Sequence, residues 1–170
     1  ALARLDGKSV GIIANNPLFK GGAIDADACR KVQAFFVLCD SFNIPIVLLV
    51  DQPGFLIGME GEQKGVTGKV MNWLNAMTLV TVPKISVIVR KSYGRAYVCM
   101  GGGRHSDEVA AWPTAEISFM SPDFATKIVH GVGVGEPGFE DALADIRKGA
   151  DVWGLAAVYA AQSVIKPQDT

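Results

Sequence analysis

Apolar positions in the first half of the chain fall into three short continuous runs, each followed by polar turn residues. The runs cover residues 10–14, 44–50 and 84–90 and are rich in Val and Ile. Such residues favour strands. The run 44–50 is apolar without alternation, which predicts a strand covered by helices on both faces. Pro45 lies at its entry, where a missing N–H is tolerated.

Between these runs, apolar residues recur at spacings of three and four, which predicts amphipathic helices. The first helix is expected to begin near Asp25 or Asp27, either of which could cap it, and to end near Phe42. The second is expected over residues 62–78. Its predicted buried face consists of Val66, Val70, Leu74 and Met77, with Trp73 beside it.

Strands that alternate with helices predict parallel pairing with right-handed crossovers. In such sheets, ligands bind at the C-terminal ends of the strands. The loops that follow the three predicted strands, residues 15–23, 51–60 and 91–96, are therefore expected to lie together at one edge.

The second half of the chain predicts shorter elements. A strand is expected over 116–120, and Ser121-Pro122-Asp123 is a strong helix start, with an N-cap residue, a proline and an acidic residue in the first turn. A glycine-rich loop follows over 131–138, and two further helices are expected near 138–148 and 151–162.

The candidate chemical centre is the segment Lys91–Met100, which follows the β-branched run Ile85–Val89. A buried strand that turns sharply into a helix leaves backbone N–H groups unpaired and pointing one way. Such a turn suits an oxygen that carries or develops negative charge. The alternative is an ordinary corner between a strand and a helix.

Composition narrows the function classes. Of the 170 residues, 49% are hydrophobic and 19% charged, with a net charge of −1, which suits one domain with a large core. The charge argues against nucleic-acid binding, and no apolar run approaches the roughly 18 residues of a membrane span. No ligand set predicts a metal site. Cys29, Cys39 and Cys99 are expected to be reduced and buried, as in a cytosolic protein.

Two loop motifs carry a family resemblance. They are Asp51-x-Pro53-Gly54-Phe55-x-x-Gly58-x-x-x-Glu62-x-x-Gly65, and Val82-Pro83-Lys84 followed by Arg90-Lys91-Ser92-Tyr93-Gly94-x-Ala96-Tyr97. Three further segments fit the same pattern: Gly11-x-x-Ala14-Asn15-x-Pro17, Cys39-Asp40-x-Phe42-Asn43-Ile44-Pro45 and Val164-Ile165-x-Pro167-x-Asp169-Thr170. In order and spacing the chain resembles the biotin-dependent acyl-CoA carboxyltransferases nearly end to end.

The resemblance is to the C-terminal half of the carboxyltransferase β subunit, as in propionyl-CoA carboxylase. It implies an α/β fold of the crotonase and Clp-like kind, a superhelix of ββα units with a mostly parallel sheet. Residues 1–170 would be this C-terminal domain, truncated before the last helices and lacking the N-terminal half. In the family the N-terminal half holds the acyl-CoA and the C-terminal half holds carboxybiotin. The two halves come from different subunits across a dimer interface.

The resemblance also implies site residues. The family's Gly-Ala amides hold the urea oxygen of biotin, and the matching positions are Arg95 and Ala96, after the tight turn at Gly94. Arg95 departs from the family's glycine. An arginine keeps the backbone N–H donor that glycine has, while its side chain adds bulk and positive charge. Two alternatives follow, an intact site and a site that the Arg95 side chain disables.

Other residues are candidates for binding. An apolar wall against biotin or the pantetheine arm is expected from Pro53, Gly54, Phe55 and Leu56. Tyr97 could line the pocket or simply pack, and Val98 matches a position implicated in choosing the acyl chain, or is an ordinary core residue. Asp51 is expected to tie down its loop through backbone hydrogen bonds. The cations Arg90, Lys91 and Arg104 are expected to be solvated surface charges.

The resemblance implies a carboxyltransferase that moves carboxyl between carboxybiotin and the α-carbon of an acyl-CoA. The alternatives are a biotin-dependent decarboxylase subunit and a non-catalytic assembly module of a carboxylase complex. A Clp-type protease fails because Ser92 precedes the turn and no His is well placed.

The cofactor implied is biotin, carried on a partner protein or domain, with a coenzyme A ester as substrate. The implied partners are the N-terminal carboxyltransferase half, a biotin carboxyl carrier and a biotin carboxylase. A dimer of trimers is expected for the full-length protein, in the cytoplasm, or the mitochondrial matrix of a eukaryote, with the isolated domain inactive alone.

Overall fold

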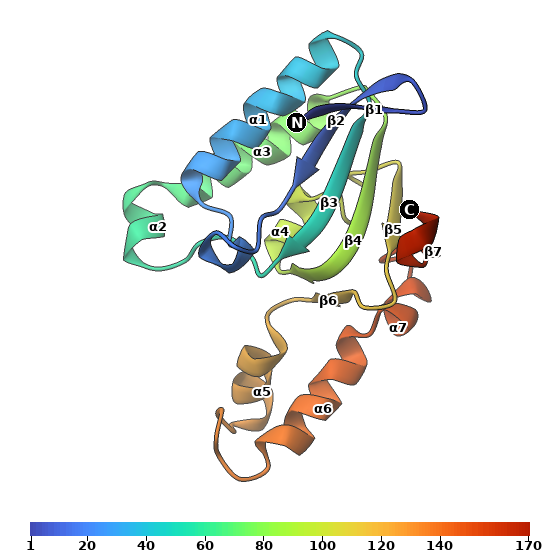
Figure 1. Cartoon of the computed structure of the whole chain (residues 1–170). Coiled ribbons are helices and arrows are strands. Elements are labelled where there is room, and N and C mark those ends of the chain that lie inside the picture. The colour runs from blue at the N-terminus through green and yellow to red at the C-terminus, as the bar shows by residue number, and fades with distance from the viewer.

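The computed structural model describes residues 1–170 and has a mixed sheet with helices packed against it (Figure 1). The strands are β1 (Leu2–Leu5), β2 (Lys8–Ala14), β3 (Ile46–Gln52), β4 (Lys84–Tyr93), β5 (Glu108–Ala111), β6 (Glu116–Ser118) and β7 (Ser163–Val164). The helices are α1 (Ala26–Ser41), α2 (Met59–Gln63), α3 (Val66–Leu79), α4 (Arg95–Cys99), α5 (Pro122–His130), α6 (Phe139–Ala150) and α7 (Val152–Ala156). Short 3₁₀ turns cover Lys20–Gly22 and Pro167–Asp169.

The sheet is mostly parallel, as predicted. Its order is β1-β2-β3-β4-β5-β7, and β6 pairs with the C-terminal part of β4. Only β1 runs antiparallel, joined to β2 by a tight turn in which Asp6 and Gly7 both have positive φ. Strands β1, β5 and β7 were not predicted from the sequence. Strand β4 was predicted to end at residue 90, and it continues to Tyr93.

Helix α1 begins where its predicted cap lies. The Asp25 carboxylate accepts a hydrogen bond from the Ala28 amide at 2.9 Å, which satisfies an orphan donor of the first turn. The α1 residues Cys29, Phe36 and Cys39 are completely buried. Helices α1 and α3 run side by side along one face of the sheet (Figure 1).

The predicted single helix over 62–78 is wrong, because the chain forms two helices, α2 and α3. Gly65 lies between them in the left-handed region, with φ of 63° and ψ of 43°, where a helix cannot continue. The predicted buried face also needs correction. Trp73 is fully buried, and Leu74 is only half-buried.

The prediction that helices cover both faces of the second strand is also wrong. Along β3 the burial alternates: Ile46, Leu48 and Val50 are buried, while the residues between them are half-buried. Ile85, the β4 partner of Val47, is 45% exposed. The helices therefore cover one face of β3 fully and leave the other partly open.

Helices α5 and α6 pack against each other and project from the sheet beyond β6 (Figure 1). Helix α7 ends at Ala156 rather than near 162. Tyr159 adopts a positive φ of 59°, and the Ala160 amide donates to the Leu155 carbonyl at 3.0 Å, which closes the helix. None of the helices combines the length and hydropathy that a membrane span requires.

Candidate active site

The loops after β2 and β3 lie together at the C-terminal edge, as predicted. The Asn15 side chain accepts a hydrogen bond from the Asp51 amide at 3.0 Å. Ile24 donates to the Gly54 carbonyl at 3.0 Å, and Leu56 donates to the Ile24 carbonyl at 2.8 Å. The first loop thus pairs like a short strand with the loop that contains the predicted wall.

Asp51 joins this assembly to the end of β4. Its carboxylate lies 2.9 Å from the Arg90 guanidinium and accepts a weaker bond from the Lys91 amide at 3.3 Å. The pairing raises the pKa of Arg90 above its ordinary value, chiefly through the hydrogen bonds to Asp51. Asp51 therefore ties down its loop as predicted, but Arg90 forms an ion pair and is not simply a solvated charge.

The turn between β4 and α4 is centred on Gly94. Its φ of 62° and ψ of −149° lie in a region open only to glycine, and an added Cβ would approach the Phe119 carbonyl at 3.3 Å. The Gly94 amide donates to the Ser118 carbonyl at 2.9 Å. The turn is thereby fixed between β4 and the end of β6.

Arg95 and Ala96 form the first turn of α4, so their amides have no acceptor within the helix. Ala96 is completely buried, whereas the Arg95 side chain is exposed and makes no salt bridge. The backbone geometry of the turn thus does not depend on the Arg95 side chain.

Tyr97 and Val98 follow on the same helix and are half-buried. The Tyr97 hydroxyl donates to the Ala160 carbonyl at 2.8 Å and accepts from the Gly103 amide at 2.9 Å. Its ring lies against Gly102, where an added Cβ would come within 2.4 Å. These contacts give Tyr97 a packing role that anchors α4.

The predicted wall residues Pro53, Gly54, Phe55 and Leu56 are all half-buried. The Phe55 ring meets the Trp73 ring edge to face, with centroids 6.1 Å apart, so part of its apolar surface packs on α3. The structure places the wall next to the turn because β3 and β4 are neighbours, with Gln52 paired to Ser92.

Gln52 and Ser92 are buried polar residues that were not among the predicted site residues. Both are 0% exposed, and the Gln52 amide nitrogen lies 3.4 Å from the Tyr93 carbonyl oxygen. Gln52 Oε1 and Ser92 Oγ have no hydrogen-bond partner. A polar residue that continues the buried positions of a strand, directly before a proline, is the sequence signal that could have found Gln52.

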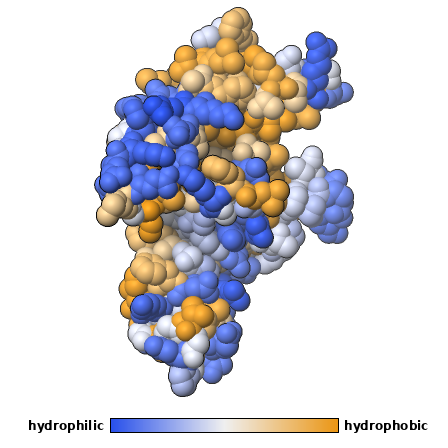
Figure 2. Space-filling model, turned by 60° about the vertical axis from the view of Figure 1, so that its left-hand side comes forward, coloured by the Kyte–Doolittle hydropathy of each residue, from blue (hydrophilic) through white to orange (hydrophobic).

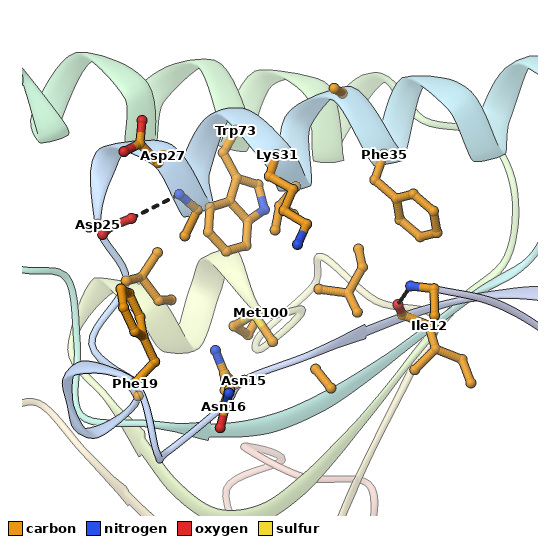
Figure 3. Close-up of a pocket in the computed structure, with 18 of the residues that line it drawn as sticks. Ile12, Asn15, Asn16, Phe19, Asp25, Asp27, Lys31, Phe35, Trp73 and Met100 are labelled. Carbon is orange, nitrogen blue, oxygen red and sulfur yellow. Dashed lines mark hydrogen bonds between the residues drawn. The ribbon is translucent and has the colours of Figure 1, made fainter.

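A separate cavity of about 710 Å³ opens between α1 and β2 (Figure 3). Its lining is mainly apolar and includes Ile12, Phe19, Phe35, Trp73 and Met100. Figure 3 shows Lys31 extending from α1 into the space beside Trp73. None of the predicted site residues lines this α1–β2 cavity, so this cavity and the candidate turn are different places.

The three cysteines are free and buried, as predicted. Burial raises the pKa of the Cys29 thiol to about 11 and that of Cys99 to about 12, and it also raises the pKa of Cys39. These thiols are therefore protonated at neutral pH and belong to the core.

The Tyr93 hydroxyl donates a hydrogen bond to the Glu116 carboxylate. The pKa of Tyr93 is raised, first by burial of the hydroxyl and second by this carboxylate.

Large apolar side chains remain exposed around the strand-end loops and on the projecting helices. Figure 2 shows apolar surface spread over this side of the molecule in several patches between hydrophilic ones. The most exposed large apolar side chains near the loops are Leu18, Ile57, Met59 and Phe119. Patches of this kind are typical of surfaces that another polypeptide covers.

Comparison with known proteins agrees with this architecture. Residues 1–133 match the carboxyl transferase domain family. The chain is 44% identical over 135 residues to the propionyl-CoA carboxylase beta chain of Roseobacter denitrificans, covering 79% of this chain and 26% of that protein. It is 48% identical over 128 residues to the methylmalonyl-CoA decarboxylase subunit alpha of Veillonella parvula, covering 75% of this chain and 25% of that protein.

Among solved structures, the chain resembles the transcarboxylase 12S subunit, solved as a hexamer assembly with methylmalonyl-coenzyme A bound. The TM-score is 0.91 at 36% identity, over 99% of this chain and 34% of that one. The chain spans only about a quarter of the length of these two curated relatives. The family match covers more than three quarters of the chain, and the fold is the crotonase-like fold of these enzymes. The chain therefore belongs to the carboxyltransferase family of the acyl-CoA carboxylases.

Proposed function

We propose that this chain is the biotin-binding half of an acyl-CoA carboxyltransferase, which transfers carboxyl between carboxybiotin and the α-carbon of an acyl-CoA. The observation that carries the proposal is the turn at Gly94. It holds the amides of Arg95 and Ala96 at the start of α4, without helical acceptors and beside the loop Pro53–Leu56.

The two amides suit an oxygen on which negative charge develops. When carboxyl is released from the ring nitrogen of biotin, the urea oxygen gains that charge. Donors fixed in a dry site contribute roughly 3–4 kcal/mol to such a step. The burial of Ala96 and the bond from Gly94 to Ser118 keep these amides in place before the reaction. Arg95 supplies its amide whatever its side chain is.

Substrate contacts follow from the same arrangement. Pro53, Gly54, Phe55 and Leu56 form the apolar wall against biotin or the pantetheine arm, because all four keep part of their surface exposed at the strand ends. Val98 favours a more apolar acyl group than an acidic residue would. Tyr97 acts by holding α4, through its hydroxyl bonds to Ala160 and Gly103.

The enzyme is an assembly, and this chain is inactive alone. Biotin arrives on a carrier protein or domain loaded by a biotin carboxylase, and the acyl-CoA is held by an N-terminal carboxyltransferase half across a dimer interface. The exposed apolar side chains near the loops support such a covering partner. Two trimers would build the full-length assembly, in the cytoplasm or in a mitochondrial matrix.

A biotin-dependent decarboxylase, which runs the same site in reverse, is the second candidate. It is supported by the 48% identity to a methylmalonyl-CoA decarboxylase subunit. One experiment tests both. The complete subunit is incubated with a free biotin analogue, or its carboxylated form, and a series of CoA esters, and label transfer is followed in each direction. Transfer in either direction supports the site, and its direction separates the two functions. No transfer with any ester would overturn both.

A further inference from the structure

We propose that Gln52 is a positioning residue that couples the Pro53–Leu56 loop to the Gly94 turn. The inference rests on the proposed function, and it assigns a role to a residue outside the predicted site. Gln52 would act through its neighbours on both sides of the site, without touching biotin or the acyl-CoA itself.

Its place in the sheet is unusual for a carboxamide. Along β3, the side chains that face the helices are Ile46, Leu48, Val50 and then Gln52, each exposed by 1% or less. Three are aliphatic, and an aliphatic fourth would be the simplest way to complete this row. Core packing alone therefore does not account for the carboxamide.

The carboxamide connects the two loops of the proposed site. Its nitrogen lies 3.4 Å from the carbonyl oxygen of Tyr93, the residue directly before Gly94. In the other direction, Gln52 is bonded to Pro53, whose ring fixes its own φ, so a shift at residue 52 passes directly into the wall. Gln52 therefore links the Gly94 turn, through its side chain, to the Pro53–Leu56 loop, through its backbone.

The surroundings are polar but incompletely satisfied. Ser92, the β4 partner of Gln52, lies across an irregularity in the ladder between Val50 and Gln52. Neither Gln52 Oε1 nor Ser92 Oγ has a hydrogen-bond partner. Buried polar atoms are usually paired, and exceptions occur where a site needs them. These unpaired polar atoms lie beside the end of β4, directly before the Gly94 turn that holds the amides of Arg95 and Ala96.

Ser86 lies on β4, like Ser92, but its hydroxyl is fully hydrogen-bonded. It is also completely buried, and its hydroxyl is 2.7 Å from the Met100 carbonyl and 2.9 Å from the Ser106 hydroxyl. It therefore contributes to the core in the ordinary way, at the far end of α4 from the turn. Ser86→Ala is the matched control for the loss of a buried hydrogen bond on β4.

The test compares Gln52→Met, Ser86→Ala and the unchanged protein in the complete carboxyltransferase. Gln52→Met should lower kcat by about tenfold or more, with KM for the CoA ester nearly unchanged, because small misplacements of catalytic donors cost that much or more. Its thermal midpoint should not fall. Ser86→Ala should lower the thermal midpoint and leave kcat unchanged. An unchanged kcat in Gln52→Met, or a fall in both variants alike, would overturn the inference.

A second readout does not depend on activity. In the 170-residue chain, hydrogen exchange of the Arg95 and Ala96 amides is followed by NMR. Gln52→Met should accelerate exchange at these two amides several-fold relative to the rest of α4, and Ser86→Ala should not. Unchanged exchange would overturn the coupling. Absence of transfer in the unchanged enzyme, with the exchange difference present, would count against the proposed function alone.

Discussion

The guanidinium of Arg90 lies 2.9 Å from the carboxylate of Asp51, so the end of β4 is joined to the end of β3 beside the candidate site. The Asp51 side chain is 16% exposed and that of Arg90 53% exposed. The same carboxylate accepts the Lys91 amide. The ion pair and this backbone bond together hold the loop 51–56 against the strand that leads to the turn.

Asp51→Asn should therefore weaken the ion pair and leave the loop tethered mainly through the backbone. Because the pair is partly exposed, its coupling energy with Arg90→Met in a double-mutant cycle should be about 1 kcal/mol or less. Urea unfolding of the four proteins measures it. A coupling energy of several kcal/mol would show that the pair lies in a drier environment than its exposure indicates.

Asp25 should make stability depend on pH. The Ala28 amide, and then Lys20 at 2.9 Å, lower the pKa of Asp25 below its ordinary value. A lowered folded-state pKa gives stability that is present above the unfolded-state pKa, near 4, and lost as pH falls through the folded value. Asp25→Ala should cost about 1 kcal/mol at neutral pH.

The cost of Asp25→Ala should shrink as the pH falls from about 4 through the lowered folded-state pKa of Asp25, because only below that folded-state value is the carboxylate protonated in both states. Unfolding curves of both proteins across this range provide the measurement. A difference in stability that is constant with pH would contradict the assigned role of the charge.

Gly101 should tolerate no side chain. Its φ is 94°, and an added Cβ would lie 2.0 Å from Ser86 Oγ and 2.1 Å from Ser106 Oγ. Gly101→Ala should therefore cost roughly 2–5 kcal/mol through strain and overpacking. Gly103 also has a positive φ, of 68°, but nothing lies within 4 Å of its added Cβ. Gly103→Ala should cost only about 1 kcal/mol. Equal losses in thermal unfolding would contradict this packing around Gly101.

Arg95→Gly should leave carboxyl transfer within about tenfold of the unchanged enzyme, or raise it, because the proposal assigns the work to the backbone amide. The exposed Arg95 side chain makes no ion pair that the change would break. The measurement is the rate of carboxyl transfer by the complete subunit, with and without Arg95→Gly. Complete loss of transfer would give the guanidinium a role of its own and contradict the backbone account.

The strand–helix alternation of the first 100 residues was predictable because its apolar periodicity is strong. The two-residue β7 and the small-residue strand β5 have too little pattern to be seen without their partners. The break between α2 and α3 depends on Gly65 adopting a left-handed conformation, and glycine inside a helical pattern does not by itself predict that. Trp73 was expected beside the buried face of this helix, and its full burial depends on contacts with other elements, such as the Phe55 ring, which the helix pattern alone does not show.

The candidate site was predicted in its motifs and only partly in its contacts. The loop motif and the turn could be recognised because they are continuous in sequence. The Arg90 ion pair, the bonds of the Tyr97 hydroxyl and the burial of Gln52 depend on residues brought together by the fold. The α1–β2 cavity was missed because its lining combines the N-terminus, β2, the segment 15–25, α1, α3 and Met100, which are separated in the sequence.

The most direct measurement is a crystal structure of the complete subunit with a biotin analogue bound. We expect the urea oxygen to lie within about 3 Å of the amide nitrogens of both Arg95 and Ala96, with the ring against Pro53–Leu56. A urea oxygen bound elsewhere, for example beside Trp73 in the α1–β2 cavity, would contradict the central claim.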